Sequence, residues 1–513
     1  MRFRTKRIGP PLREDCTFAY MPCGVPRRYG KGEKSMKRIG ANEFDAWIKR
    51  HYADARISGE PCDIREIAKH SDAAKKDTLF VCLKGIEADG HDYALAAYKN
   101  GCRAFLCERA LSLPRDACTV LVRSIRGGLF YLLSDFYGIS EGDFRFCAIT
   151  GTKGKTTTSV MLTHLLNKGG YRAACSTTLG LYDGKETRKT ENTTSDLFTV
   201  TSWLADLKRE GIRYVVIEAS SAALSGARLF GMHFDVGVLT SFSNDHIGKG
   251  EHKTFAEYLC AKRSLFSSYG IKTAIYKRDM ERGAYIVSDC AHTVPLPSDA
   301  EAVLQVFELT EGQRFIYNGR SIFLPLPGAH NRTNARLALA AAAALTGKGE
   351  EYFEPYFSDV YVPGRYEQFM KNGVCIVIDY AHNHESFLAV AETAKNRSRA
   401  RVIAVFGSVG GRGEGRRGAL AVAADALFDC SVITADNPGR EDALHICAEI
   451  YAAFPDKSHA RIVSDRAQAI LYAFSLCRPG DILLLLGKGH ENFQRTKNGC
   501  VPFSEKEILL SEP

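Results

Sequence analysis

Residues 146–157 read Phe146-Cys-Ala-Ile-Thr150-Gly151-Thr-Lys-Gly154-Lys155-Thr156-Thr157. The first five residues form a β-type run, and a helix-like stretch follows the last threonine. The glycines between them let backbone N–H groups surround phosphate oxygens at a helix N-terminus. A lysine supplies positive charge for the outer phosphates, and a threonine hydroxyl binds Mg²⁺. This stretch predicts a strand that runs directly into an ATP site.

The spacing of this loop differs from the standard phosphate-binding loop, because Ile149 stands where its first glycine belongs. A Gly-rich turn without a ligand is the alternative interpretation. The Lys155-Thr156-Thr157 ending favours the ATP site, since it provides both the cation and the hydroxyl that the chemistry needs.

The composition is that of a globular protein with about three domains, at roughly 150 residues per domain. The chain has 513 residues, of which 45% are hydrophobic and 25% charged. Its longest apolar run, Leu337–Leu345, is far shorter than the ~20 residues that span a bilayer. The sixteen cysteines include no Cys-x-x-Cys pair, which favours a reducing compartment. We expect a cytoplasmic protein with no membrane partner.

The positive charge is concentrated at the N-terminus. Of a net charge of +9, residues 1–40 carry +8, from eleven Lys/Arg and three Asp/Glu. A basic tail on a near-neutral body is typical of a solvated extension, or of sequence that precedes a true start at Met36. The chain shows no recognisable nucleic-acid recognition fold, so we expect no nucleic-acid partner. We also expect a monomer.

Strand-like and helix-like stretches alternate and divide the chain into blocks. We expect a basic extension over residues 1–35, an N-terminal domain over 36–143, a central domain over 144–348 and a C-terminal domain over 349–513. The segment Thr346–Gly364 is turn-rich and is interpreted as a linker. The C-terminal block contains four apolar runs, each followed by a polar turn and a helical stretch: Val374–Ile378, Val402–Phe406, Ser431–Thr434 and Ile482–Leu486. This pattern predicts an α/β fold with a doubly wound parallel sheet, whose ligands bind at the carboxyl ends of its strands.

Two further residues of the central block are candidates for the chemistry. Glu218 follows the β-type run Tyr214–Ile217, where it could hold a metal at the nucleotide or be an exposed strand-end carboxylate. Lys262 falls inside an apolar helical stripe that includes Phe255 and Phe266. A snorkelling stem would explain it. The alternative is a desolvated amine of lowered pKa that reacts with carbon dioxide and becomes an anionic metal ligand.

Taken together, these motifs resemble those of the Mur ligase family from about Asp63 to the end of the chain. In that family a Gly-Thr-x-Gly-Lys-Thr-Thr loop opens the central ATPase domain, and a Tyr-x-x-Ala-Lys-x-x-Leu-Phe segment carries a carbamylated lysine. The second segment is Tyr258–Phe266 here, with Lys262 at the lysine position. The resemblance implies a three-domain architecture, with a P-loop ATPase domain between an N-terminal domain that binds the UDP-substrate and a C-terminal Rossmann-like domain that binds the amino acid.

The resemblance also assigns roles to individual residues. It implies that ATP is bound by Gly151, Thr152, Lys153, Gly154, Lys155, Thr156, Thr157, Asn331, Asn334, Arg365 and Asp379. It implies that the UDP-substrate and the amino acid are bound by Asn192, Thr193, Thr194, Ser220, Arg228, Arg412, Asp436, Asn437, Gly487 and Glu491. It implies that Mg²⁺ is held by Thr156, Glu218, His246 and carbamylated Lys262, and that Lys155, Glu218, Lys262 and His246 are catalytic.

The implied reaction is an ATP-dependent ligation in peptidoglycan precursor synthesis. A diamino acid, meso-diaminopimelate or L-lysine, would be added to UDP-N-acetylmuramoyl-L-alanyl-D-glutamate through an acyl phosphate, with ATP and Mg²⁺. Two alternatives stay open. One is another amide ligase of the superfamily, such as a folylpolyglutamate synthase, against which the segments Asn192–Thr194 and Gly487–Glu491 argue. The other is a catalytically silent nucleotide-binding paralogue, which Ile64, Ala222 and Ser241 keep open because they depart from the family pattern.

The choice of diamino acid is the least determined feature. In the family, the enzyme that adds meso-diaminopimelate carries Asp-Asn-Pro-Arg, whose arginine pairs with the distal carboxylate. Here the segment is Asp436-Asn437-Pro438-Gly439-Arg440, so a glycine takes that position and an arginine follows it. Arg412 is another candidate partner for the carboxylate. We expect relaxed or altered specificity, which leaves L-lysine and meso-diaminopimelate equally open.

Overall fold

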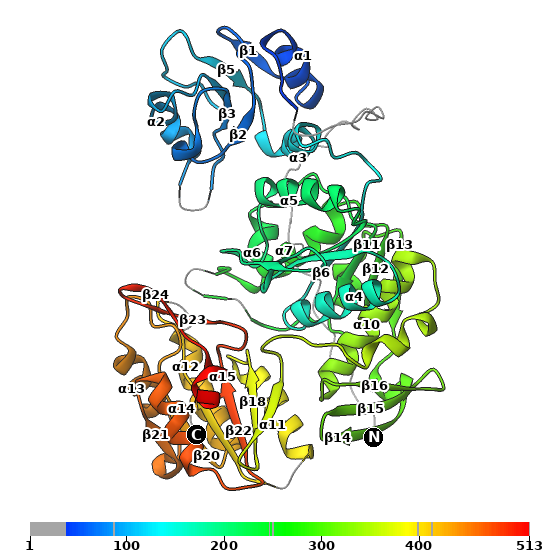
Figure 1. Ribbon diagram of the computed structural model, residues 1–513, viewed down its shortest axis with the longest axis vertical. Helices are drawn as coiled ribbons and strands as arrows, with labels where there is room; N and C mark the ends of the chain where they lie inside the picture. The colour runs from blue at the N-terminus through cyan, green and yellow to red at the C-terminus, as the bar shows by residue number, and fades with distance from the viewer. Residues whose placement is uncertain are drawn as a thin grey trace, which may run out of the picture.

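The computed structural model describes residues 37–85, 88–245, 247–248, 251–397, 400–411 and 414–511. They form three α/β regions that follow one another along the chain, each built on its own sheet. In Figure 1 the N-terminal region lies at the top, the central region below it, and the C-terminal region at the lower left. The predicted α/β class is confirmed.

The N-terminal region has a five-stranded sheet in the order β1-β5-β4-β3-β2, parallel except for the edge strand β1. Its strands are β1 (Arg56–Ser58), β2 (Glu66–Ala68), β3 (Thr78–Val81), β4 (Ala104–Cys107) and β5 (Cys118–Leu121). Its helices are α1 (Ala41–His51), α2 (Ala94–Lys99) and α3 (Ile125–Phe136), with short 3₁₀ turns at Ser71–Ala73 and Gly90–Tyr93. Helix α3 leads into the central region, where it contacts α5 (Figure 1).

The central region is built on an eight-stranded sheet in the order β13-β12-β11-β6-β10-β7-β8-β9. Its strands are β6 (Arg145–Thr150), β7 (Ala173–Thr177), β8 (Gly180–Tyr182), β9 (Thr187–Arg188), β10 (Tyr214–Glu218), β11 (Val236–Leu239), β12 (Thr273–Lys277) and β13 (His292–Leu296). Its helices are α4 (Lys155–Lys168), α5 (Leu197–Arg209), α6 (Ser221–Ser225), α7 (Phe255–Ser268), α8 (Gly283–Ile286), α9 (Asp299–Ala302) and α10 (Ala329–Thr346). Helix α10 contains the apolar run Leu337–Leu345.

Helices cover both faces of this sheet, which explains why its strands are continuously apolar. Successive residues of β6 point to opposite faces, so Cys147 and Ile149 join one core while Ala148 joins another. The first core is formed with helices α4 and α10, and the second with helices α3, α5 and α7. Because the central strands are parallel, their carboxyl ends meet at one edge.

A small antiparallel sheet and a short irregular segment complete the central region. The sheet contains β14 (Val303–Leu309), β15 (Gly312–Tyr317) and β16 (Arg320–Leu324). The segment that was predicted to be a linker forms 3₁₀ turns at Glu350–Tyr352 and Glu354–Phe357. Its Phe353 and Phe357 are fully buried in the core shared with α4 and α10. This segment therefore packs as part of the central region rather than as a free linker.

The C-terminal region has a six-stranded sheet in the order β17-β18-β22-β19-β20-β21, parallel except for the edge strand β17. Its strands are β17 (Glu367–Lys371), β18 (Val374–Asp379), β19 (Val402–Phe406), β20 (Cys430–Ile433), β21 (Ala460–Ile462) and β22 (Ile482–Leu486). A separate hairpin is formed by β23 (Phe493–Thr496) and β24 (Gly499–Pro502). The helices are α11 (His384–Arg397), α12 (Glu414–Leu427), α13 (Ala443–Ala452), α14 (Arg466–Leu476) and α15 (Glu505–Ser511), with a 3₁₀ turn at Lys457–His459.

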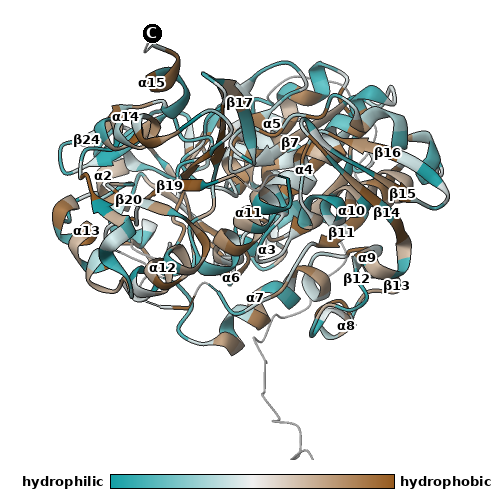
Figure 2. Ribbon diagram, turned by 90° about the horizontal axis from the view of Figure 1, so that it is seen from below, coloured by the Kyte–Doolittle hydropathy of each residue, from teal (hydrophilic) through white to brown (hydrophobic). Residues whose placement is uncertain are grey.

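The predicted doubly wound arrangement is present in this region. Ala404 and Phe406 of β19 pack with α11, α12 and α13, whereas Ile403 and Val405 pack with α14 and α15. Figure 2 shows β19 as a brown, hydrophobic strand surrounded by helices that carry teal, hydrophilic residues. Among the described residues, no helix combines the length and apolar character needed to cross a membrane.

Candidate active site

A cavity of about 2380 Å³ lies between the central and C-terminal regions. The loop Gly151–Thr157, called the phosphate loop below, lines the cavity from the central region with its residues Thr152–Thr157. Glu218 and Lys262 line it from the same region. Asp379, Asn437 and the loop from Gly487 to Glu491 contribute to it from the C-terminal region. Apart from Gly151 and Thr194, the described residues that the sequence assigned to the nucleotide and to the other substrates therefore share one cavity.

The two glycines of the loop after β6 hold conformations and contacts that other residues would disturb. Gly151 has a φ of +149° and Gly154 a φ of +82°, both in the region that favours glycine. A Cβ atom on Gly151 would lie 2.1 Å from Oγ1 of Thr240, and one on Gly154 would lie 2.4 Å from Oδ1 of Asn334. The backbone can therefore curl tightly at the start of α4, as a phosphate-binding loop requires.

Lys155 is the first residue of α4, and its side chain turns back over the loop. Its Nζ donates hydrogen bonds to the carbonyl oxygens of Gly151 and Thr152, each at 3.0 Å. Burial lowers the pKa of Lys155 to about 8, although the negative charge of Glu218 acts in the opposite direction. The cation therefore lies where the loop would place phosphate oxygens.

Thr156 and Glu218 meet beside this loop. Thr156 Oγ1 donates to Oε2 of Glu218 at 2.9 Å, and the N–H of Thr178 donates to the same oxygen at 3.0 Å. Glu218 is only 2% exposed, so the interpretation as an exposed strand-end carboxylate is wrong. A hydroxyl and a carboxylate are the hard oxygen ligands that Mg²⁺ prefers, so these residues fit the ion that the family implies.

Lys262 lies on α7 with a side chain that is 1% exposed, so a stem that snorkels to solvent does not describe it. Its Nζ donates to the carbonyl oxygen of Gly151 at 2.9 Å and to Oγ1 of Thr150 at 3.0 Å. Burial, with a smaller effect of the neighbouring Lys155 charge, lowers the pKa of Lys262 well below its ordinary value. A lowered pKa increases the fraction of neutral amine, which is the form that reacts with carbon dioxide.

His246 and Arg412 lie outside the described residues, so their assigned roles stay predictions.

The segment Asn192–Thr194 is fixed to the end of β10, next to Glu218. Thr194 Oγ1 donates to the carbonyl oxygen of Glu218 at 2.7 Å and accepts from the N–H of Ser220 at 3.0 Å. Arg228 Nη1 donates to the carbonyl oxygen of Thr194 at 3.3 Å. Asn192, Thr193, Ser220 and Arg228 all line the cavity, and the hydrogen bonds hold them at one place on its wall.

Asn331 and Asn334 lie on the first turns of α10 and line the cavity beside the phosphate loop. Asn331 Nδ2 donates to the carbonyl oxygen of Pro327 at 2.8 Å, and Asn334 Oδ1 accepts from Thr158 Oγ1 at 3.3 Å. These contacts fix the start of α10 against the loop and α4.

Arg365 and Asp379 bring the C-terminal region to the phosphate loop. Arg365 Nη2 lies 3.5 Å from Oγ1 of Thr156, and its guanidinium carbon lies 4.6 Å from the centre of the Tyr380 ring. The carboxylate of Asp379 accepts from the N–H groups of Tyr366 and Ala381, both at 2.7 Å. Burial nevertheless raises the pKa of Asp379 above its ordinary value.

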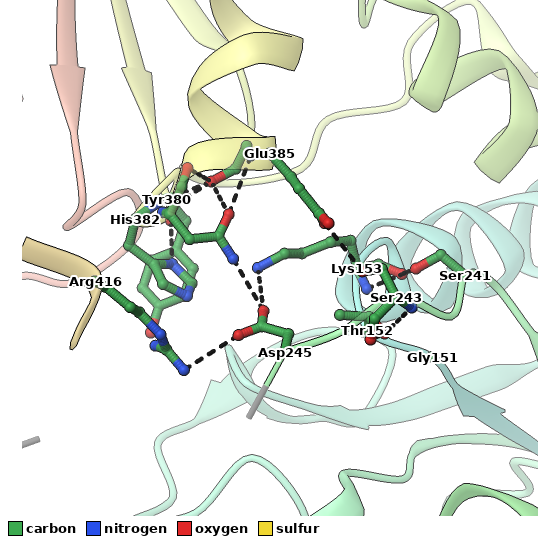
Figure 3. Close-up of polar contacts among 12 residues, drawn as sticks. Gly151, Thr152, Lys153, Ser241, Ser243, Asp245, Tyr380, His382, Glu385 and Arg416 are labelled. Carbon is green, nitrogen blue, oxygen red and sulfur yellow. Dashed lines mark hydrogen bonds and ion pairs between the residues drawn. The ribbon is translucent and has the colours of Figure 1, made fainter. Parts of the chain in front are cut away.

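Asp245 links the central and C-terminal regions, as Figure 3 shows. Its Oδ2 lies 3.0 Å from Nζ of Lys153 and accepts from Nδ2 of Asn383 at 2.9 Å. Its Oδ1 lies 3.2 Å from Nη2 of Arg416. The side chain of Lys153 therefore points toward Asp245, although the sequence assigned this residue to the nucleotide. Nothing in the local sequence signals the network, because its members come from separate regions.

The residues assigned to the amino acid converge on a buried lysine. Lys488 is 0% exposed, and its Nζ donates to Oδ1 of Asn437 and to Oε2 of Glu491, both at 3.1 Å. Asn437 Nδ2 donates to the same Glu491 oxygen at 2.7 Å. Gly487 has a φ of +110°, and a Cβ atom added to it would lie 3.0 Å from Oδ2 of Asp436. Lys488 holds this cluster together, a role that the sequence reasoning missed.

The three departures from the family pattern have different places in the structure. Ile64 is fully buried, and its backbone pairs with that of Ile39 in the N-terminal region. Ser241 Oγ accepts from the N–H of Lys153 at 2.8 Å, so it supports the phosphate loop. Ala222 lines the cavity.

Comparison with known proteins agrees with this site. Residues 149–342 match the Mur ligase middle domain, and residues 364–489 match the glutamate ligase domain of the Mur ligases. The chain is 31% identical over 463 residues to the UDP-N-acetylmuramoyl-L-alanyl-D-glutamate--2,6-diaminopimelate ligase of Bacillus velezensis, covering 87% of this chain and 93% of that relative. The chain belongs to the Mur ligase family. This Mur ligase is therefore an ATP-dependent enzyme that forms a C–N bond.

Solved structures show the same fold. A UDP-N-acetylmuramoyl-L-alanyl-D-glutamate--2,6-diaminopimelate ligase superposes with a TM-score of 0.62 at 24% identity, covering 88% of this Mur ligase and 94% of that chain. A folylpolyglutamate synthase of Mycobacterium tuberculosis in complex with ADP superposes with a TM-score of 0.59 at 21% identity, covering 70% and 91%. The architecture is thus shared by ligases that act on different substrates.

Proposed function

We propose that this Mur ligase uses ATP to add a diamino acid to UDP-N-acetylmuramoyl-L-alanyl-D-glutamate in peptidoglycan precursor synthesis. The observation that carries the proposal is that one cavity brings three groups of residues together. These are the phosphate loop, the buried Glu218 and Lys262, and the pair Asn437 and Glu491 that Lys488 holds in place. The name of the Bacillus velezensis relative, which is 31% identical, supports the choice of substrate. A ligase that consumes ATP would act in the cytoplasm, where we propose that this one is located.

The reaction needs an activated carboxylate, because a free carboxylate is a poor electrophile. The substrate carboxylate would attack the γ-phosphorus of ATP, giving an acyl phosphate and ADP. The free amine would then attack the acyl carbon, and the tetrahedral intermediate would expel phosphate as the amide forms. Charge neutralisation and positioning would supply most of the rate acceleration.

Residues of the central region would act on the phosphate side of this reaction. The loop Gly151–Thr157 would hold the phosphates with its N–H groups, and Lys155 would balance the charge that develops on them. Thr156, Glu218, His246 and carbamylated Lys262 would hold Mg²⁺, which supplies charge neutralisation between the carboxylate and the γ-phosphate. The carbamate would form when the neutral amine of Lys262 adds to carbon dioxide and releases a proton.

Residues of the C-terminal region would act on the amino-acid side. The carboxylate of Glu491 accepts hydrogen bonds from Lys488 and Asn437, which fix its orientation. A carboxylate held in this way would accept hydrogen bonds from an incoming ammonium group. The Asp245 network and Arg365 keep this part of the cavity next to the phosphate loop.

The proposal is tested by the product that the enzyme makes. The purified chain is incubated with ATP, Mg²⁺, the UDP-muramoyl-dipeptide and one diamino acid, and the products are analysed by mass spectrometry. We expect ADP and a nucleotide product heavier by one diamino acid residue. A parallel incubation with a folate and glutamate tests the alternative ligase, since a glutamylated folate would identify a folylpolyglutamate synthase. Binding of both nucleotides without turnover would identify a silent paralogue.

A further inference from the structure

One corner of the cavity is formed by two segments that are distant in the sequence. Strand β23 lies along the loop that follows β20, where the N–H of Gly439 donates to the carbonyl oxygen of Arg495 at 2.9 Å. The N–H of Arg495 in turn donates to Oδ1 of Asn437 at 2.8 Å. The backbone of Arg495 is therefore fixed against the loop that carries Asp436 and Asn437.

The alternation of side chains along β23 turns Arg495 toward the cavity. Gln494 Nε2 donates to the carbonyl oxygen of Asp436 at 2.9 Å, so this side chain faces the loop. Its neighbours Phe493 and Arg495 line the cavity. Within the described part of the chain, the guanidinium of Arg495 is exposed and forms no hydrogen bond or ion pair, so it keeps its donors for a ligand.

Gly439, whose backbone is bonded to that of Arg495, leaves open space in the cavity wall. No described atom lies within 4 Å of the position that its Cβ would take. Arg440, which follows the missing clamp position in the sequence, is exposed and is not among the described residues that line the cavity. Lys488 is buried, so among the described residues of this corner Arg495 is the cation that a ligand can reach.

The corner also carries negative charge on its other side. Glu491 and Asp436 both line the cavity there, and Lys488 lies between them, 3.1 Å from Glu491 and 3.7 Å from Asp436. A cavity wall that carries both a guanidinium and carboxylates matches a ligand end that has both a carboxylate and an ammonium group. The side chain of L-lysine ends in an ammonium group alone, and it would leave the guanidinium without a partner.

We propose that Arg495 binds the distal carboxylate of the incoming amino acid. The accepted substrate is then a diamino dicarboxylic acid of the meso-diaminopimelate class, and L-lysine is discriminated against. This inference rests on the proposed function. It replaces the expectation of relaxed specificity, which considered Arg440 and Arg412 but not Arg495.

The test compares amide formation with meso-diaminopimelate and with L-lysine for four proteins: the unchanged chain, Arg495→Ala, Arg495→Lys and Arg440→Ala. The unchanged chain should prefer meso-diaminopimelate. Arg495→Ala should lower kcat/KM for meso-diaminopimelate by about 30-fold or more, mainly through KM, because a charge-assisted pair is lost. Its kcat/KM for L-lysine should stay within about threefold, since that substrate does not use the pair.

The other variants separate binding from structural effects. Arg495→Lys should lose less than Arg495→Ala, because it keeps the charge but not the two-pronged contact. Arg440→Ala is the matched control and should leave both substrates within about twofold. Thermal melting of each variant shows whether the β23–β24 hairpin is intact.

Three results would overturn the inference: an equal loss for both amino acids in Arg495→Ala, a selective loss in Arg440→Ala, or a preference of the unchanged chain for L-lysine. In each of these cases ligation still occurs, so the proposed function stands. If the unchanged chain forms no amide with either amino acid, the proposed function fails and this inference fails with it.

Discussion

The hydroxyl of Thr156 donates a 2.9 Å hydrogen bond to Oε2 of Glu218, although the two residues are 62 positions apart in the chain. They meet because β6 and β10 are adjacent parallel strands whose carboxyl ends lie at the same edge of the sheet. Thr156 lies in the helix that follows β6, and Glu218 is the last residue of β10. A strand–loop–helix motif and a strand-end carboxylate thus form one site.

Lys155→Ala should reduce kcat for amide formation by about 100-fold or more, because the charge developing on the transferred phosphate loses its fixed cation. Lys168→Ala is the matched control. Lys168 lies at the other end of the same helix, pairs with Asp359 and should be replaceable without loss of activity. Steady-state release of phosphate measures both variants. Near-normal turnover of Lys155→Ala would show that Gly151–Thr157 is only a turn.

Lys262→Ala should lose most activity and recover part of it when short-chain carboxylic acids are added. The substitution removes the carbamate but leaves space in which a small carboxylate can take its place. Lys262→Met fills that space and should not be rescued, so it serves as the control. If acetate or a similar acid does not increase the turnover of Lys262→Ala, the carbamylated lysine is not part of the mechanism.

The strands that carry the site could be predicted from the sequence. The run Ile482–Leu486 is β22 with the same bounds, because a parallel strand that is buried on both faces is apolar at every position. The buried amine of Lys262 could also be recognised, since it interrupts an apolar stripe on α7. These features depend on residues that are close together in the chain.

Features that depend on pairing between distant segments could not be predicted. The segment 350–362 has the glutamates and proline of a turn, and only packing against α4 and α10 shows why Phe353 and Phe357 are there. Arg495 lies opposite Gly439 only because β23 runs along the loop after β20. Asp245 and Arg416 belong to different regions of the molecule.

Arg416→Ala should weaken the attachment of the C-terminal region to the phosphate loop. Arg416 contacts both Asp245 at 3.2 Å and Glu251 at 2.9 Å, and both partners belong to the central region. We expect KM for ATP to rise by about tenfold, a cost typical of one partly buried charge-assisted contact. Arg401→Ala is the control, because its ion pair with Asp481 lies within the C-terminal region. An equal change of KM in both variants would contradict a bridging role for Arg416.

Glu441→Gln should lower the free energy of unfolding by about 1–3 kcal/mol at neutral pH. Both carboxylate oxygens of Glu441 accept from Arg417 at 2.8 Å, which lowers the pKa of Glu441 from its ordinary 4.5 to about 2. A depressed carboxyl pKa stabilises the fold above pH 4.5, and this stabilisation is lost as the pH falls toward 2.

Urea titrations between pH 7 and pH 3, followed by circular dichroism, measure this effect. The difference between the unchanged chain and Glu441→Gln should shrink as the pH decreases. Glu507→Gln, at an exposed position of α15, serves as the control and should differ little from the unchanged chain at any pH. A difference that grows at low pH would contradict the assigned role of the Arg417 pair.

The central claim is that this Mur ligase joins a carboxylate to an amine through an acyl phosphate. It is tested most directly by labelling the reacting carboxylate of the UDP-muramoyl-dipeptide with a heavy oxygen isotope and analysing the released phosphate by mass spectrometry. The account predicts that one labelled oxygen moves from the carboxylate to each phosphate, because the carboxylate oxygen that attacks the γ-phosphorus leaves with it. Phosphate that carries no label while the amide forms would contradict this mechanism.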